Sequence, residues 1–302
     1  MLEMIINPKK AERRSWEMFF VGFFYAGLSL LLVNWIFGKD PVLSHYAGIL
    51  MITFTVMFSI PFVYYTIRLE EKKISAESGT LSLLKEHRKA IMVFLWLFLG
   101  YVVAYSIGYM LLSSTESIAL SPGKSDQISA AANSFKAQIE TYCLINRPAN
   151  YQECIRQYGL EGALTGTAFI TSGERLFLIF WNNMNVLIFT LIFSLIFGAG
   201  VIFILAWNAS VIAAAIGIYT QRNIAVLHLG ISRYMLHGLP EIASYFIVAL
   251  AGGLISVAVI KHEAGTEKFW SVLHDSLNLI IIAVAVLFIA ALLEVFVTPL
   301  LF

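Results

Sequence analysis

Long apolar stretches without charges alternate with short polar segments along this chain. Several of these stretches reach the roughly 18–20 residues that a membrane-spanning helix needs. The pattern predicts seven spans, approximately over residues 16–37, 44–67, 91–112, 184–205, 208–219, 239–260 and 277–301. The fifth is short, so it either spans or forms a re-entrant segment. Because the apolar runs are continuous rather than alternating, they predict an all-α transmembrane helical bundle and not a β-barrel.

Composition agrees with a multi-pass membrane protein. Hydrophobic residues make up 59% of the 302 residues and charged residues only 13%, whereas a soluble domain is usually nearer a quarter charged. The first apolar run lacks a convincing small-residue cleavage site and is interpreted as a retained span. The net charge of +1 gives no indication of a nucleic-acid partner. The first partner we expect is therefore the lipid bilayer of the cell membrane.

Basic residues predict the orientation, since Lys and Arg in short loops favour the cytoplasmic side. The loop between the first two spans has only Lys39, whereas the segments before the first span and after the second are rich in basic residues: Lys9, Lys10, Arg13, Arg14, Arg68, Lys72, Lys73, Lys85, Arg88 and Lys89. We therefore expect a cytoplasmic N-terminus and an extracytoplasmic segment over residues 113–179. If the fifth segment spans, which we favour, the C-terminus is extracytoplasmic; if it is re-entrant, the C-terminus is cytoplasmic.

The outer segment is predicted to contain a small helical hairpin closed by a disulfide. Its first helix is indicated by apolar residues at helical spacing, which are Ile128, Ala131, Ala132, Phe135, Ile139 and Tyr142. Residues 146–150 break this helix, and a second short helix is expected over 151–158, with Gly159 just past its end. Cys143 and Cys154 would then lie at matching heights, where an oxidising location favours a bond between them. Two free buried thiols are the alternative.

Two carboxylates stand out because they lie in apolar stretches. Glu241 opens the sixth predicted span and Glu294 lies near the end of the seventh. A charged side chain within a membrane helix costs about 2.5–3.5 kcal/mol, so each carboxylate needs a partner or a function. The start of the sixth span and the end of the seventh lie on one side of the membrane, which places both acids at similar depth. With His237, Asn182 and Asn183 they form a predicted intramembrane polar cluster of five residues.

Further polar residues are expected beside these acids. If the fifth segment spans, Asn182, Asn183 and Asn185 at the start of the fourth predicted span lie on the same side as the acids. Arg175 and Arg233 are candidate counter-ions. Glu241 can also be interpreted as an acid in the first turn of a helix, because Pro240 fits such a turn. Glu294 can likewise be a carboxylate bonded to another helix, which would fix the packing. A proton or ion relay remains an alternative, and we assign no metal site and no cofactor.

Small residues occur along the fourth to sixth predicted spans. Asn208 follows Trp207 at the boundary between the fourth and fifth spans, and as a strong N-cap residue it is predicted to start the fifth helix. Gly198, Gly252 and Gly253 are predicted to allow close helix packing, because small residues let helices approach where lipid offers no hydrophobic driving force. A substrate path lined by these residues is the alternative.

The order of these features resembles the stage II sporulation protein M family in its broad prokaryotic form, archaea included. The resemblance rests on Asn182-Asn183, Gly198, Asn208, the sequence His237-Gly238-Leu239-Pro240-Glu241, Gly252-Gly253, and the closing run from Ala290 to Pro299 that contains Glu294 and Thr298. It covers residues 91–302. Residues 1–90, a two-span hairpin with a basic cytoplasmic loop, look like an addition. Asn208 is followed by Ala209, where the family pattern often has Gly.

The resemblance implies a membrane organiser rather than an enzyme, because the family's namesake anchors partners that degrade peptidoglycan. Our leading hypothesis is a non-enzymatic scaffold that recruits protein partners through its extracytoplasmic loop or basic cytoplasmic loop, with or without self-association into a homo-oligomer. The runner-up is a transporter or channel component, which predicts a water-accessible cavity reaching Glu294. An intramembrane hydrolase using His237 is the third hypothesis. The sequence argues against it, because no candidate nucleophile occurs in a recognisable motif.

Overall fold

The computed structural model of the chain describes residues 8–38, 40, 42–71, 80–119, 130–146, 150–157, 171–197, 201–220, 223–260 and 265–302. Within these ranges the regular structure is helical and contains no strand. Seven of the described helices are long and apolar enough to cross a membrane. The prediction of an all-α membrane bundle is therefore confirmed.

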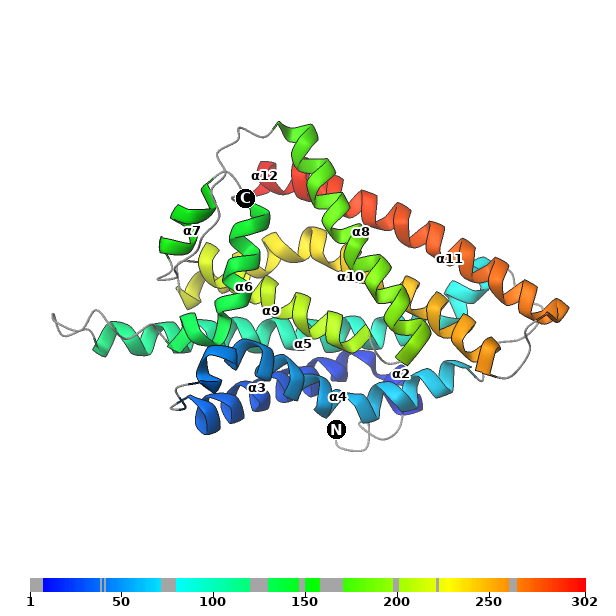
Figure 1. Cartoon of the computed structure of the whole chain (residues 1–302), viewed down its shortest axis with the longest axis horizontal. Coiled ribbons are helices and arrows are strands. Elements are labelled where there is room, and N and C mark those ends of the chain that lie inside the picture. The colour runs from blue at the N-terminus through cyan, green and yellow to red at the C-terminus, as the bar shows by residue number, and fades with distance from the viewer. Residues whose placement is uncertain are drawn as a thin grey trace.

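The spanning helices are α3 (Met18–Phe37), α4 (Ala47–Glu71), α5 (Thr80–Ala119), α8 (Ser172–Phe197), α9 (Val201–Tyr219), α10 (Leu227–Ile260) and α11 (Glu267–Leu292). Shorter elements join or flank them, namely α2 (Pro8–Arg13), η1 (Ser15–Glu17), η2 (Leu43–Tyr46), α6 (Ala130–Asn146), α7 (Tyr151–Gln157), η4 (Ile224–Val226), η5 (Leu293–Val297) and α12 (Thr298–Leu301). Figure 1 shows α8 and α11 crossing one face of the bundle at an angle to α3 and α5.

The boundary between the fourth and fifth spans differs from the prediction. We expected one span over 184–205, because no charge interrupts that run, but α8 is Ser172–Phe197 and α9 already begins at Val201. The first turn of α8 contains the charged residues Glu174 and Arg175. The hydropathy pattern excluded these residues from the predicted span, although they belong to the same helix. The corrected fifth span, Ile202–Tyr219, has 18 residues and is long enough to cross a membrane.

Glycines allow α3 and α5 to pack in direct backbone contact. A Cβ atom on Gly100 would overlap the carbonyl oxygen of Phe19 and would lie 2.7 Å from the backbone nitrogen of Phe23. On the facing helix, a Cβ on Gly22 would overlap the carbonyl oxygen of Leu97. Because the two glycines face each other's helix, the N-terminal helices are packed firmly against α5 rather than tethered loosely to it.

Buried hydroxyl groups join α4 to α5. The hydroxyl of Tyr105 lies 2.6 Å from that of Thr55, and the hydroxyl of Tyr101 lies 2.6 Å from that of Ser59. All four side chains are fully buried. Interhelical hydrogen bonds of this kind hold membrane helices in register, because the lipid offers no competing partner.

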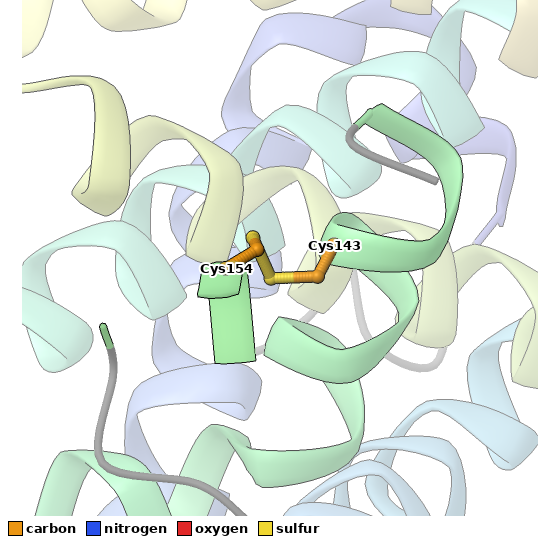
Figure 2. Close-up of a disulfide and its surroundings, with 2 residues drawn as sticks. All are labelled: Cys143 and Cys154. Carbon is orange, nitrogen blue, oxygen red and sulfur yellow. A yellow bond between two sulfur atoms is a disulfide. The ribbon is translucent and has the colours of Figure 1, made fainter. Parts of the chain in front are cut away.

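The segment between α5 and α8 contains the predicted helical pair. Cys143 of α6 and Cys154 of α7 are joined by a disulfide with their Cα atoms 5.8 Å apart, as Figure 2 shows. The apolar face of α6 is buried on the bundle through Phe135, Ile139 and Tyr142. Ile128 and Gly159 lie outside the described residues.

The helix α6 crosses the ends of several spans. The Phe135 ring packs edge-on against Tyr109 of α5, with the ring centroids 5.3 Å apart, and Ser134 donates a hydrogen bond of 3.1 Å to Asn34 of α3. Further contacts join α6 to α4 and α9. Figure 1 shows α6 standing across one end of the bundle, with α7 beside it. The helical pair is therefore a cap packed on the membrane domain.

Candidate functional site

His237 and Glu241 lie in the middle of a continuous helix. We expected the sixth span to begin at Leu239 and Glu241 to lie in its first turn, but α10 starts at Leu227 and continues through Pro240. Glu241 is thus about 21 Å along the helix axis. Proline is tolerated inside membrane helices because neighbouring groups satisfy the freed backbone. The first-turn interpretation of Glu241 is therefore wrong, and His237 lies one turn from it on the same face.

Glu294 lies in a π-helical turn. The five residues Leu293–Val297 form η5 between α11 and α12. The backbone N–H and the side-chain hydroxyl of Thr298 both donate to the carbonyl of Leu293, the hydroxyl over 3.0 Å. Pro299 explains the widened turn, because it has no N–H for the carbonyl of Val295 and its ring would crowd that carbonyl. Such single π-helical turns are frequent at functional sites.

A hydrogen bond joins the His237 segment to the end of the chain. Nδ1 of His237 lies 3.3 Å from Oγ1 of Thr298, and both side chains are buried. Thr298 has one hydroxyl hydrogen, which it gives to Leu293, so its oxygen accepts and His237 donates from Nδ1. The histidine-containing sequence and the closing Glu-x-x-x-Thr-Pro sequence are thus in direct contact.

A cavity of about 650 Å³ lies between α8, α9 and α10. The helix α6 and the π-helical turn η5 complete its wall. Its polar lining residues are Thr141, Tyr142, Asn182, Asn183, Asn185, Asn208, Tyr234, His237, Glu241 and Glu294. Its apolar lining residues are Ile179, Val186, Phe189, Phe203, Ile204, Trp207, Val211, Ile212, Ala215 and Gly238. All five members of the predicted polar cluster therefore line one cavity.

The two carboxylates differ in their protein contacts. Glu241 accepts a hydrogen bond of 3.0 Å from the hydroxyl of Tyr245, one turn along α10. In the part of the chain that the structure describes, no hydrogen bond or ion pair joins the Glu294 carboxylate to a protein group. Both residues are half-buried and keep surface towards the cavity. Glu294 is therefore available to a ligand.

The predicted counter-ions do not pair with these acids. Arg233 packs over the ring of Tyr219, with its guanidinium carbon 4.8 Å from the ring centroid. Neither Arg233 nor Arg175 lines the cavity, and among the described residues neither forms an ion pair with Glu241 or Glu294. No three His, Cys, Asp or Glu side chains in the described ranges are arranged to hold a metal ion.

Asn208 does not start a helix. It lies inside α9, where its side-chain amide donates 2.8 Å to the carbonyl of Ile204 in the preceding turn. The prediction was wrong because α9 already begins at Val201, seven residues before the asparagine. Asn208 still contributes to the site, since it lines the cavity.

Of the glycines predicted to allow close helix packing, Gly252 does so and Gly253 does not. A Cβ on Gly252 would lie 2.9 Å from the Cβ of Ser194 and 3.0 Å from the carbonyl oxygen of Leu191, so α10 approaches α8 closely there. A Cβ on Gly253 would meet nothing within 4 Å, which makes its predicted packing role wrong. Successive helical residues point about 100° apart, so one of the pair faces α8 and the other does not. Gly198 lies outside the described residues.

Aromatic residues of the site escaped the sequence analysis. Trp207, Phe189 and Phe203 line the cavity, as does Tyr142 of α6. In a chain with this many apolar residues, aromatic side chains in a span carry no signal that separates a cavity wall from a lipid-facing surface. The spacing of Asn182 and Asn185 with Phe189 on one face of α8 is the pattern that could have indicated them.

The comparisons with known proteins give one match. Residues 89–299 match the family described as stage II sporulation protein M. No curated protein and no solved structure matches the chain. The matched region contains α8 to α11 and every residue that lines the cavity. Because the match covers more than half of the 302 residues, the chain belongs to the stage II sporulation protein M family.

Proposed function

We propose that this protein is a membrane transport component whose substrate site is the cavity between α8, α9 and α10. The observation that carries the proposal is the pair of carboxylates, Glu241 and Glu294, in a cavity of about 650 Å³. Ionisable residues inside membrane proteins commonly mark substrate or ion pathways. The volume falls in the range of about 300–1,000 Å³ that is typical of small-molecule sites.

A purely structural role explains the two acids less well. A carboxylate that fixes helix packing should bond to a second helix, as the hydroxyl groups between α4 and α5 do. Glu241 instead bonds within its own helix, to Tyr245, and Glu294 bonds to no described residue. The contact that ties α10 to the C-terminal turn is the one between His237 and Thr298. A bound solute or water would give the acids the partners that the protein does not supply.

Thiol accessibility tests the proposal directly. The two native cysteines are joined in the disulfide, so one introduced cysteine is the sole free thiol. We expect the water-soluble reagent methanethiosulfonate-ethylammonium to modify Asn183→Cys in the purified protein in liposomes. The matched control is Ile281→Cys, whose parent side chain is 58% exposed on α11 but does not line the cavity. That thiol should react with lipid-soluble maleimide and resist the water-soluble reagent. Equal resistance at both positions would refute a water-accessible site.

Recruitment of protein partners is the second candidate function. The disulfide between α6 and α7 favours it, because it secures a small helical surface at the end of the bundle. Neither role requires the protein to be an enzyme. The two differ in their dependence on Glu294, because a scaffold should tolerate Glu294→Gln and a substrate site should not.

A further inference from the structure

The cavity is lined by both polar and apolar side chains. Glu241, Glu294, His237 and the asparagines of α8 are its most polar lining residues. Phe189 of α8 and the α9 residues Phe203 and Trp207 give the same wall a large aromatic surface. A fully hydrated inorganic ion would leave the aromatic wall without a partner. A ligand with one polar group and an apolar body matches both kinds of side chain.

The charge of the lining favours a cation. The cavity wall contains two carboxylates and four asparagines, whose carbonyl oxygens can accept hydrogen bonds, but it contains no Lys or Arg. An anion in this site would face both carboxylates, whereas Arg175 and Arg233, the guanidinium groups that act on the site from a distance, do not line its wall. The faces of Trp207 and Tyr234 add groups that attract organic cations.

Cavity-lining residues with exposed side chains occur on both α8 and α9, which form a seam where the two helices contact each other little. Although these helices are consecutive, α8 packs mainly on α10 and α11, whereas α9 packs mainly on α5 and α10. At the seam Phe189 is 48% exposed and Phe203 is 36% exposed. Asn185 is also exposed, although it lies near the middle of α8. These exposed lining residues make the seam the candidate route into the cavity.

We propose that the cavity binds an organic cation with an apolar body, which reaches Glu241 and Glu294 through the seam between α8 and α9. This inference rests on the proposed function and adds the class of substrate and its route. The cationic group could come from a free hydrophobic amine or from the amino headgroup of a lipid. The cavity of about 650 Å³ accommodates either group.

Two probes of similar size and opposite charge test the charge preference. The full chain, purified in dodecyl maltoside, is titrated with tetraphenylphosphonium and with tetraphenylborate by isothermal titration calorimetry. We expect saturable binding of the phosphonium and at least tenfold weaker binding of the borate. Glu294→Gln and Glu241→Gln should each weaken phosphonium binding at least tenfold. Asp275→Asn, an acid on α11 outside the cavity wall, should leave it unchanged.

Competition separates the two sources of the cation. Displacement of tetraphenylphosphonium by lysophosphatidylethanolamine, but not by lysophosphatidylglycerol, would identify an amino headgroup as the ligand. Displacement by dodecylamine alone would identify a free amine. Either result supports the inference, since the competing group is an ammonium.

The route is tested with Phe203→Cys in nanodiscs. Lipid-soluble pyrene maleimide should label this thiol, and tetraphenylphosphonium should slow the labelling at least fivefold. Labelling of Ile281→Cys should not respond to the phosphonium. Equal binding of the borate, or phosphonium binding that is indifferent to both glutamine variants, would overturn the inference. If Asn183→Cys still reacts with the water-soluble reagent in that case, the proposed function survives; if it does not, both proposals fail.

Discussion

At the scale of single residues, Thr298 connects the two most distinctive sequences of the chain. Its hydroxyl donates to the Leu293 carbonyl and accepts from Nδ1 of His237. We expect Thr298→Val to lower the free energy of unfolding by about 0.5–1.5 kcal/mol, because it leaves a buried histidine nitrogen without its partner. Unfolding in sodium dodecyl sulfate, combined with His237→Phe in a double-mutant cycle, measures the coupling between the two side chains.

Thr190→Val is the matched control for this residue pair. Thr190 is fully buried, but its hydroxyl bonds only to the Val186 carbonyl of its own helix. It should show no coupling to His237→Phe. If Thr298→Val likewise shows no coupling, the contact between α10 and the C-terminal turn contributes nothing measurable to stability.

Some residues of the candidate site could be predicted from the sequence and others could not. Glu241, Glu294 and the asparagine pair could be recognised because polar groups in apolar runs are costly and therefore stand out. Asn208 could not be placed correctly, because an asparagine that starts a helix and one that bonds back to the preceding turn look alike in sequence. The π-helical turn at Glu294 depends on which backbone groups find partners, and hydropathy carries no such information.

At the scale of helices, the contact between α3 and α5 depends on Gly100. An added Cβ would meet backbone atoms of Phe19 and Phe23, which cannot move aside as a side chain could. We expect Gly100→Ala to destabilise the protein by about 1–3 kcal/mol through overpacking. Thermal unfolding followed by tryptophan fluorescence provides the measurement.

Gly27→Ala is the control on the same helix pair. Gly27 also lies in α3, but a Cβ there would meet nothing within 4 Å. This change should be neutral or slightly stabilising, since alanine favours helix more than glycine by about 1 kcal/mol. Similar losses from both substitutions would show that the close approach of α3 and α5 at Gly100 is not the cause of the destabilisation.

Helix existence was easier to predict than helix ends. The seven spans and the α6–α7 pair followed from apolar runs and from one amphipathic pattern. The starts of α8 and α10 were missed because their first turns are polar, and a hydropathy pattern detects the apolar core rather than the hydrogen-bonded helix. Pro240 strengthened this error. Proline is typical of the first turn of a helix in soluble proteins, but in this structure it lies inside the membrane helix α10.

At the scale of the whole molecule, the number of crossings fixes which loops share a side. Between the start of α8 and the start of α11 lie α8, α9 and α10. If all three cross the membrane, Gly173 and Glu267 lie on opposite sides; if α9 is re-entrant, they lie on the same side. The 18-residue span in α9 favours three crossings. The basic N-terminal segments and the disulfide, which requires an oxidising compartment, both favour an extracytoplasmic Gly173.

Labelling of intact cells decides both questions. We expect a membrane-impermeant maleimide to label Gly173→Cys in intact cells, and Glu267→Cys only after lysis. Both parent residues are exposed, and a Cβ on Gly173 meets nothing within 4 Å, so the substitutions should not disturb the fold. The reverse labelling pattern would invert the orientation. Labelling of both thiols from outside would instead show that α9 does not cross, and would place Gly173 and Glu267 on one side of the membrane.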